Sequence, residues 1–109
     1  MASMEFKISS DKIQEAINEK NELVRIALEQ CGMMIERYAQ ELCPVDTGRL
    51  RNSIIYEVQE DGVIVGTNVE YAPYVEYGTK RQRAQPFLKP SIQDHLDEYV
   101  SVIENSLKS

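Results

Sequence analysis

The sequence predicts a single α+β domain, because two segments with helical periodicity flank a segment with the pattern of a β-hairpin. The 109 residues suit one domain with one small core. A hydrophobic fraction of 42% and a charged fraction of 28% are ordinary for a folded globular chain. One domain is therefore expected over residues 1–109. Since Met4 is a second methionine near the start, we interpret residues 1–3 as a remnant of cloning.

The first helix is predicted over residues 10–43. Ser9 or Ser10 is the expected N-cap, and Pro44 ends the helix because the residue before a proline is displaced from the α region. The apolar residues at helical spacing form one stripe: Ile17, Val24, Leu28, Cys31, Ile35, Tyr38 and Leu42. An unbroken helix of about 30 residues is about 45 Å long, against a diameter of roughly 27 Å for a compact domain of this size. Part of the helix must then protrude or pack on another subunit, unless it breaks near Gly32.

A β-hairpin is predicted over residues 54–67. Two runs of strand-forming residues flank Glu60, Asp61 and Gly62, and the Asp-Gly pair supplies the positive φ that a tight turn requires. These strands would form a small antiparallel sheet between the helices.

A second amphipathic helix is predicted over residues 86–108. Pro86 and Pro90 are tolerated in its first turn, where backbone amides lack helical partners in any case. The apolar residues that follow at helical spacing are Ile92, Leu96, Tyr99, Val100, Ile103 and Leu107. The polar stretch before this helix, residues 79–85, has no apolar pattern, and we predict a mobile loop there.

Charge and composition argue against several classes of function. The net charge of −6 disfavours binding to nucleic acid or to a membrane surface. Cys31 and Cys43 would lie roughly 18 Å apart on one helix, which is too far for a disulfide. The single histidine, His95, is remote from both, and we expect it at the surface or at a boundary position. The sequence therefore predicts no metal, no cofactor and no catalytic Cys/His pair.

The triplet Asp46-Thr47-Gly48 has one catalytic interpretation. Aspartic proteases use this triplet to place a carboxylate beside its two-fold mate, and a dimeric retroviral-type protease is about this size. That active-site loop belongs between apolar strands, whereas here a helix ending at a proline precedes the triplet. We favour a capped turn, in which Asp46 or Thr47 accepts hydrogen bonds from backbone amides at the start of a short helical turn.

Two clusters of side chains are candidates for contact with another protein, although the tyrosines could instead pack in the core beneath the sheet and the basic run could be a solvated loop. Tyrosines recur every three residues at Tyr71, Tyr74 and Tyr77, in a segment whose periodicity suits either a helical turn or the start of a strand. Tyrosine is enriched at protein interfaces because it offers a large rigid area with a polar tip. The second cluster is a basic run on the loop, comprising Lys80, Arg81 and Arg83.

Four segments in order resemble a known family. They are Pro44-Val45-Asp46-Thr47-Gly48-Arg49-Leu50-Arg51-Asn52-Ser53-Ile54, Val65-Gly66-Thr67-Asn68, Tyr71-Ala72-Pro73-Tyr74-Val75-Glu76-Tyr77-Gly78-Thr79 and Gln85-Pro86-Phe87-Leu88-Lys89-Pro90. As a series, these segments resemble the lambdoid-phage "gene product ten" family of head-to-tail joining and minor tail proteins. The flanking helices match this family in kind only.

The resemblance implies a structural protein of a bacteriophage or prophage that acts at the neck between portal and tail tube. It implies self-assembly into a ring, with a hexamer as the expected size, and contact with portal or connector proteins and with tail-tube or tail-terminator proteins. The expected location is the neck or tail of a virion assembled in the bacterial cytoplasm, and no catalytic residue is implied. The candidates for partner contact are Asp46, Thr47, Gly48, Arg49, Leu50, Tyr71, Tyr74, Tyr77, Lys80, Arg81 and Arg83.

Two other functions remain open at this stage. One is the dimeric aspartic protease that uses Asp46, and the other is a host regulatory or adaptor domain that binds one partner. Peptide cleavage that Asp46→Asn abolishes would favour the protease. Flanking genes for portal, capsid and tail-tube proteins would favour the phage assembly protein over the adaptor.

Overall fold

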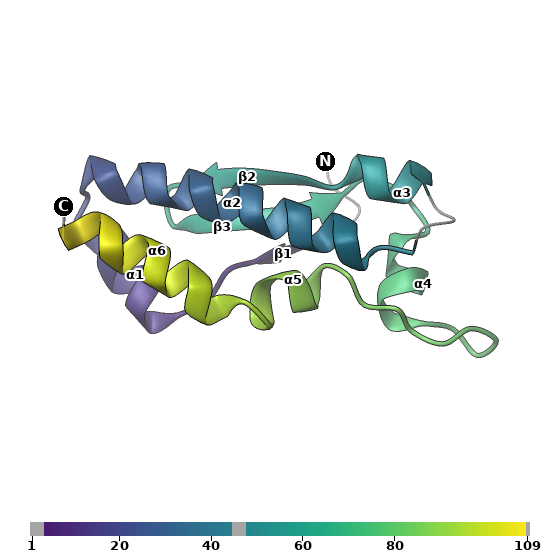
Figure 1. Cartoon of the computed structure of the whole chain (residues 1–109). Helices are drawn as coiled ribbons and strands as arrows, with labels where there is room; N and C mark the ends of the chain where they lie inside the picture. Colours follow the sequence, from purple (N-terminus) through teal and green to yellow (C-terminus); the bar gives the residue numbers. More distant parts are fainter. Residues whose placement is uncertain (1–3, 45–47, 109) are drawn as a thin grey trace.

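A computed structural model describes residues 4–44 and 48–108, and it confirms the predicted α+β class. The elements in chain order are β1 (Met4–Lys7), α1 (Asp11–Asn18), α2 (Glu22–Leu42), α3 (Gly48–Ser53), β2 (Ile55–Gln59), β3 (Gly62–Thr67), α4 (Ala72–Tyr77), α5 (Lys89–Gln93) and α6 (Leu96–Lys108). The molecule is elongated, with extents of 49 × 24 × 19 Å (Figure 1). Residues 1–3, which we interpret as a cloning remnant, lie outside the described part.

The predicted hairpin over residues 54–67 is confirmed as β2 and β3, and it belongs to an antiparallel sheet of order β1-β3-β2. In the register of this sheet, Phe6 and Tyr56 lie on either side of Val65. Val63 and Val65 are fully buried because alternate side chains of the central strand point to the core. The sequence analysis missed β1, although Met4 and Phe6 alternate there with Glu5 and Lys7.

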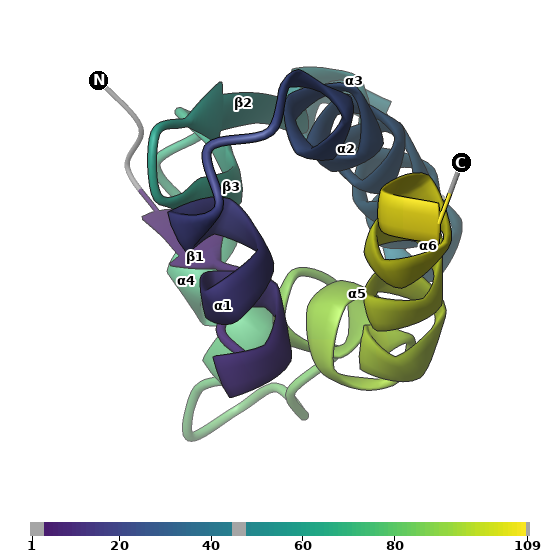
Figure 2. The same ribbon diagram turned by 90° about the vertical axis from the view of Figure 1, so that its left-hand side faces the viewer.

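Helix α2 runs along the sheet and covers its inner face, while α1, α5 and α6 complete the enclosure of the core (Figure 2). Most of the predicted apolar stripe is buried, including Val24, Leu28, Cys31 and Ile35. Leu42 is an exception, because it is exposed at the end of the helix. The long axis of the molecule therefore follows the long axis of α2.

The prediction of one helix over residues 10–43 is wrong, because the chain turns between α1 and α2. Lys20 has a φ of 54°, and the side chain of Asn21 caps α2 by accepting a hydrogen bond from the Leu23 amide at 2.8 Å. This turn lets α1 pack against β3 and α6 instead of continuing outward. The alternative break at Gly32 is also wrong, since Gly32 lies buried inside α2.

The second predicted helix, over residues 86–108, is likewise divided. It consists of α5 and α6, and the turn between them contains Asp94 and His95. The ring of His95 stacks on Tyr38 with centroids 3.5 Å apart, and its Nδ1 lies 2.5 Å from a carboxylate oxygen of Glu98. Tyr38 donates to the other oxygen of Glu98 at 2.8 Å. These contacts join α2 to the α5–α6 turn and place His95 at a half-buried boundary position.

Gly32 allows the sheet to approach α2 closely, and this contact generates a prediction. A Cβ atom at Gly32 would overlap with the ring of Tyr56. We expect Gly32→Ala to lower the free energy of unfolding by about 1–3 kcal/mol through overpacking, despite the better helix propensity of alanine. Urea denaturation followed by circular dichroism measures the change.

Gly48 supplies the matched control for this substitution. It also lies in a helix, but a Cβ atom there would meet no atom within 4 Å. Gly48→Ala should therefore leave stability unchanged or slightly raised. Equal stability of Gly32→Ala and wild type would show that the close contact does not constrain the fold.

Candidate functional site

The segments with the family pattern meet at one end of the molecule, where α3, α4 and the loop of residues 79–85 lie together (Figure 1). We call this region the α3–α4 end. Gly48, the first residue of α3, is exposed there. The proposed caps Asp46 and Thr47 lie outside the described residues. A helix directly after Gly48 differs from the strand-flanked loop of an aspartic protease, which weakens that alternative.

Arg49 connects the first of these segments to the third. Its guanidinium donates two hydrogen bonds to the carboxylate of Glu70, at 3.1 and 3.0 Å, and lies 5.6 Å from the centre of the Tyr71 ring. The hydrogen bonds from Arg49 lower the pKa of Glu70 below its ordinary value of 4.5. Both side chains are largely exposed, so this pair orients α3 relative to α4 without being sealed from solvent.

Leu50 was predicted as a partner contact, and this prediction is corrected because its side chain is fully buried in the core. Its position anchors α3 to the body of the protein. Nearby, the hydroxyls of Ser53 and Thr67 lie 2.5 Å apart, and Thr67 Oγ1 accepts a hydrogen bond from the Val69 amide at 3.1 Å. The end of β3 is thus joined to α3 and to the segment that leads into α4.

The tyrosine segment is helical and forms α4, so it is not the start of a strand. Tyr74 and Tyr77 lie one turn apart with exposed fractions of 61% and 65%, whereas Tyr71 is partly buried beside Arg49. Burying such large aromatic side chains against a partner would be favourable. Both exposed tyrosines therefore remain candidates for partner contact.

Glu76, which the sequence analysis did not single out, is the most constrained residue of this end. Its side chain is 2% exposed and accepts hydrogen bonds from three backbone amides, those of Phe87, Leu88 and Lys89, at 3.1, 2.9 and 3.2 Å. These amides lie at the start of α5, where helical partners are missing. The carboxylate thus holds together the two ends of the chain segment that leaves α4 and enters α5.

The segment between these ends, residues 79–85, is the basic loop. Its two sides are joined by hydrogen bonds from the Thr79 amide to the Gln82 carbonyl and from the Gln85 amide to the Val75 carbonyl, at 2.9 and 2.8 Å. Gly78 adopts a φ of 79°, and a Cβ atom there would lie 2.7 Å from the Ala84 amide nitrogen. Lys80, Arg81 and Arg83 are exposed on this loop. Its mobility stays a prediction, but its base is closed by defined bonds.

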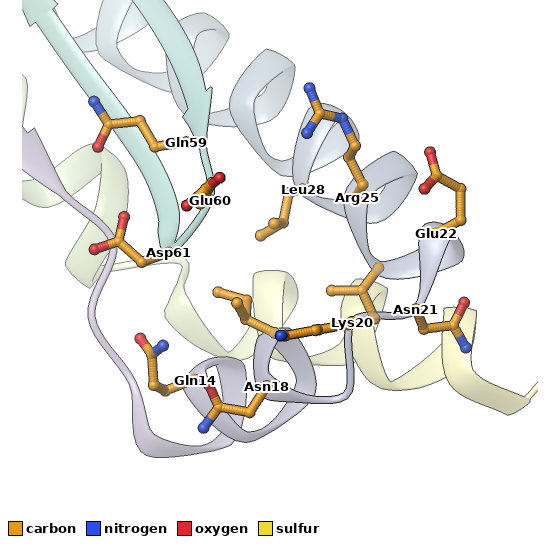
Figure 3. A pocket seen from close by; sticks show the side chains of 12 residues that line it. Gln14, Asn18, Lys20, Asn21, Glu22, Arg25, Leu28, Gln59, Glu60 and Asp61 are labelled. Atoms are coloured by element: carbon orange, nitrogen blue, oxygen red, sulfur yellow. The ribbon is translucent and has the colours of Figure 1, made fainter.

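A cavity of about 750 Å³ lies at the opposite end of the molecule. It opens between the α1–α2 turn and the β2–β3 turn, and Leu28 reaches toward it from α2 (Figure 3). Lys20 and Arg25 contribute positive charge, and Glu22, Glu60 and Asp61 contribute negative charge. Asp61 is paired with Lys7 at 2.5 Å. This mixed lining does not form an acid, base and nucleophile arrangement.

The thiol of Cys31 is buried in the core. Burial raises the pKa of the Cys31 thiol to about 12, so it stays protonated and unreactive at neutral pH. Its Sγ atom lies 3.7 Å from the Tyr99 carbonyl as a weak donor. Within residues 4–44 and 48–108, no group of three or more His, Cys, Asp or Glu side chains is placed to hold a metal ion. None of the helices in the same ranges is long and apolar enough to cross a lipid bilayer.

The bonds of Glu76 generate a prediction for stability and for the basic loop. Glu76→Gln keeps the shape of the side chain but removes the charge and turns an amide group toward three backbone donors. We expect unfolding to become easier by about 1.5–3 kcal/mol and amide hydrogen exchange in residues 79–85 to become faster. Chemical denaturation and exchange mass spectrometry measure the two effects. Glu57→Gln, on the exposed face of β2, is the control and should change neither.

A second prediction concerns the Arg49–Glu70 pair. Since the folded-state pKa of Glu70 is lowered, the pair stabilises the protein above the ordinary pKa of 4.5, and this contribution is lost as the pH falls through the lowered value. Arg49→Ala should raise the pKa of Glu70 toward 4.5, as followed by NMR titration of the carboxyl carbon. Arg51→Ala on the same helix is the control. An unchanged Glu70 titration in Arg49→Ala would show that the pair does not form in solution.

Comparison with known proteins agrees with these structural observations. A family model described as "Bacteriophage HK97-gp10, putative tail-component" matches residues 8–78, which cover α1 through α4 and the Arg49, Glu70 and Tyr74 positions of the α3–α4 end. The comparison with curated proteins and the comparison with solved structures gave no match. The match extends over more than half of the chain, and the chain therefore belongs to the HK97-gp10-like family of bacteriophage tail components.

Proposed function

We propose that this protein joins the phage head to the tail, or completes the tail, at the neck of the virion by protein–protein assembly. The observation that carries the proposal is the α3–α4 end. There, segments with the family pattern form a surface with two exposed tyrosines and three exposed basic residues. Hydrogen bonds of Arg49 and Glu76 hold the base of that surface in place before any partner binds. Such preorganisation reduces the entropy lost on association.

The proposed partners are other copies of the chain and the adjoining virion proteins. A ring of subunits, with a hexamer as the expected size, would place each α3–α4 end in an equivalent position. Portal or connector proteins would contact one face of the ring, and tail-tube or tail-terminator proteins would contact the other. The protein would assemble in the bacterial cytoplasm and remain at the neck of the finished particle.

The proposal assigns a structural role and no catalytic step. Membership in a family of tail components supports this role. The helix that follows Gly48 and the burial of Cys31 also favour it over a hydrolytic function. Cleavage of peptides by the purified chain, lost in Asp46→Asn, would contradict it.

The function is tested with phage particles produced without this gene. We expect DNA-filled heads and complete but separate tails in electron micrographs, because the contact between them is missing. Supplying the gene from a plasmid should restore joined particles. Joined, infectious virions in the absence of the gene would refute the proposal.

A further inference from the structure

An exposed apolar strip lies on α2, on the side away from the core. It consists of Leu23, Ile26 and Met33, with exposed fractions of 40%, 54% and 56%. These residues, with Gln30, follow the alternating three and four residue spacing of a single helix face. We call this surface the α2 strip. Next to it, a groove of about 390 Å³ opens between α2 and α6 and is lined by Leu23, Ile26, Ala27, Gln30, Val102, Asn105 and Ser106.

A row of carboxylates borders the α2 strip. Glu22, Glu29 and Glu36 recur every seven residues, so they line up along one side of the helix. Glu29 accepts a hydrogen bond from the Tyr56 hydroxyl at 3.0 Å, which places this row on the side facing β2. A protein surface that is apolar with positive charge beside the apolar part would therefore complement the strip and this row.

The chain itself carries one surface of that kind. Tyr74 and Tyr77 are exposed on α4, and the basic loop follows directly with Lys80, Arg81 and Arg83. Three of the 12 basic residues of the chain are on this loop, so the remainder has 9 basic against 18 acidic residues. A second copy of the chain thus repels the first as a whole but attracts it through the basic loop.

We infer that the α3–α4 end of one copy docks on the α2 strip of the next, an inference that rests on the proposed self-assembly. The exposed tyrosines bury their rings against Leu23, Ile26 and Met33. Contact between the thioether of Met33 and a tyrosine ring is itself favourable. The basic residues lie against the row of Glu22, Glu29 and Glu36. An α2 strip packed antiparallel on another α2 strip would instead bring the two rows of carboxylates together.

The contact is heterologous, since the two surfaces are different and lie apart on the molecule. Leu23 and Ile26 lie in the first turns of α2, beside the α1–α2 turn, and Met33 lies near the middle of the helix, whereas the α3–α4 end is at the other end of the long axis (Figure 1). One copy cannot bring its own surfaces together. Repetition of a heterologous contact produces a ring when the rotation closes.

Photocross-linking tests the contact in assembled particles and in the purified chain. With p-benzoylphenylalanine in place of Tyr77, ultraviolet light should yield a dimer of the chain, and mass spectrometry should find the cross-link within residues 22–33. The same amino acid in place of Glu57, which is exposed on β2, is the control and should give no dimer. Cross-links to another virion protein or to DNA, without any to a second copy, would overturn the inference.

Charge reversal supplies an independent test. Lys80→Glu/Arg81→Glu/Arg83→Glu leaves a copy with acidic surfaces on both sides of the contact, and Glu22→Lys/Glu36→Lys leaves one with basic surfaces on both sides. Each variant alone should lose joined particles by about tenfold or more, whereas the two expressed together should restore them, because every contact then pairs opposite charges. Asp97→Lys/Glu104→Lys on α6 is the control, because it changes the net charge as much as Glu22→Lys/Glu36→Lys does but lies away from the strip. It should leave the number of joined particles unchanged.

The outcomes separate this inference from the proposed function. Normal joining by either charge variant alone, or no restoration by the pair, would overturn the docking of the α3–α4 end on the α2 strip and leave the neck function intact. Joined particles in the complete absence of the gene would overturn the neck function itself.

Discussion

Helix α2 packs against the sheet on one side and against α5 and α6 on another, and these contacts set where the sheet and the C-terminal helices lie relative to each other. Its close approach to the sheet depends on Gly32, where the ring of Tyr56 occupies the space that any larger residue would need. On the other side, the stack of Tyr38 on His95 sets where the C-terminal helices turn. A change in either contact would shift the sheet or the C-terminal helices relative to α2.

The α3–α4 end combines a rigid base with an exposed tip. Its base is held by polar contacts of unequal kind: the Arg49–Glu70 pair is exposed, whereas the Glu76 carboxylate is buried and bonded to three amides. Removing a partner from a buried group costs more than removing one from an exposed group, because water cannot replace the lost bond. Glu76 is therefore the residue on which the presentation of the tyrosines and the basic loop depends most.

The two exposed surfaces have opposite character, which would suit the proposed assembly of the chain with copies of itself. An anionic body alone would stay apart from its neighbours, and an apolar strip alone would bind without selectivity. Because one loop beside two tyrosines carries a cluster of positive charge, the proposed contact would pair the α3–α4 end of one copy with the α2 strip of the next. The same division of charge would disfavour antiparallel pairing of two strips, because their rows of carboxylates would then lie side by side.

The sequence by itself determined the fold class, the β-hairpin, the helical character of both ends and the family, because these depend on local periodicity, turn residues and short motifs. It also identified the three tyrosines and the basic loop as candidates for partner contact, and the structure showed that Tyr74 and Tyr77 are the exposed tyrosines. Only the tertiary structure decided that the chain turns at Lys20 and again at His95, since both helical patterns continue through the turns. The turns let α1 pack against α6, and this tertiary contact is what favours them over a continuous helix. The tertiary structure also decided that Leu50 is core and that Glu76 is a buried anchor, because burial and amide contacts from residues 87–89 arise between segments that are distant in sequence. The α2 strip became visible for the same reason: the sequence shows which residues of a helix are apolar, but neighbouring elements determine which of them are covered.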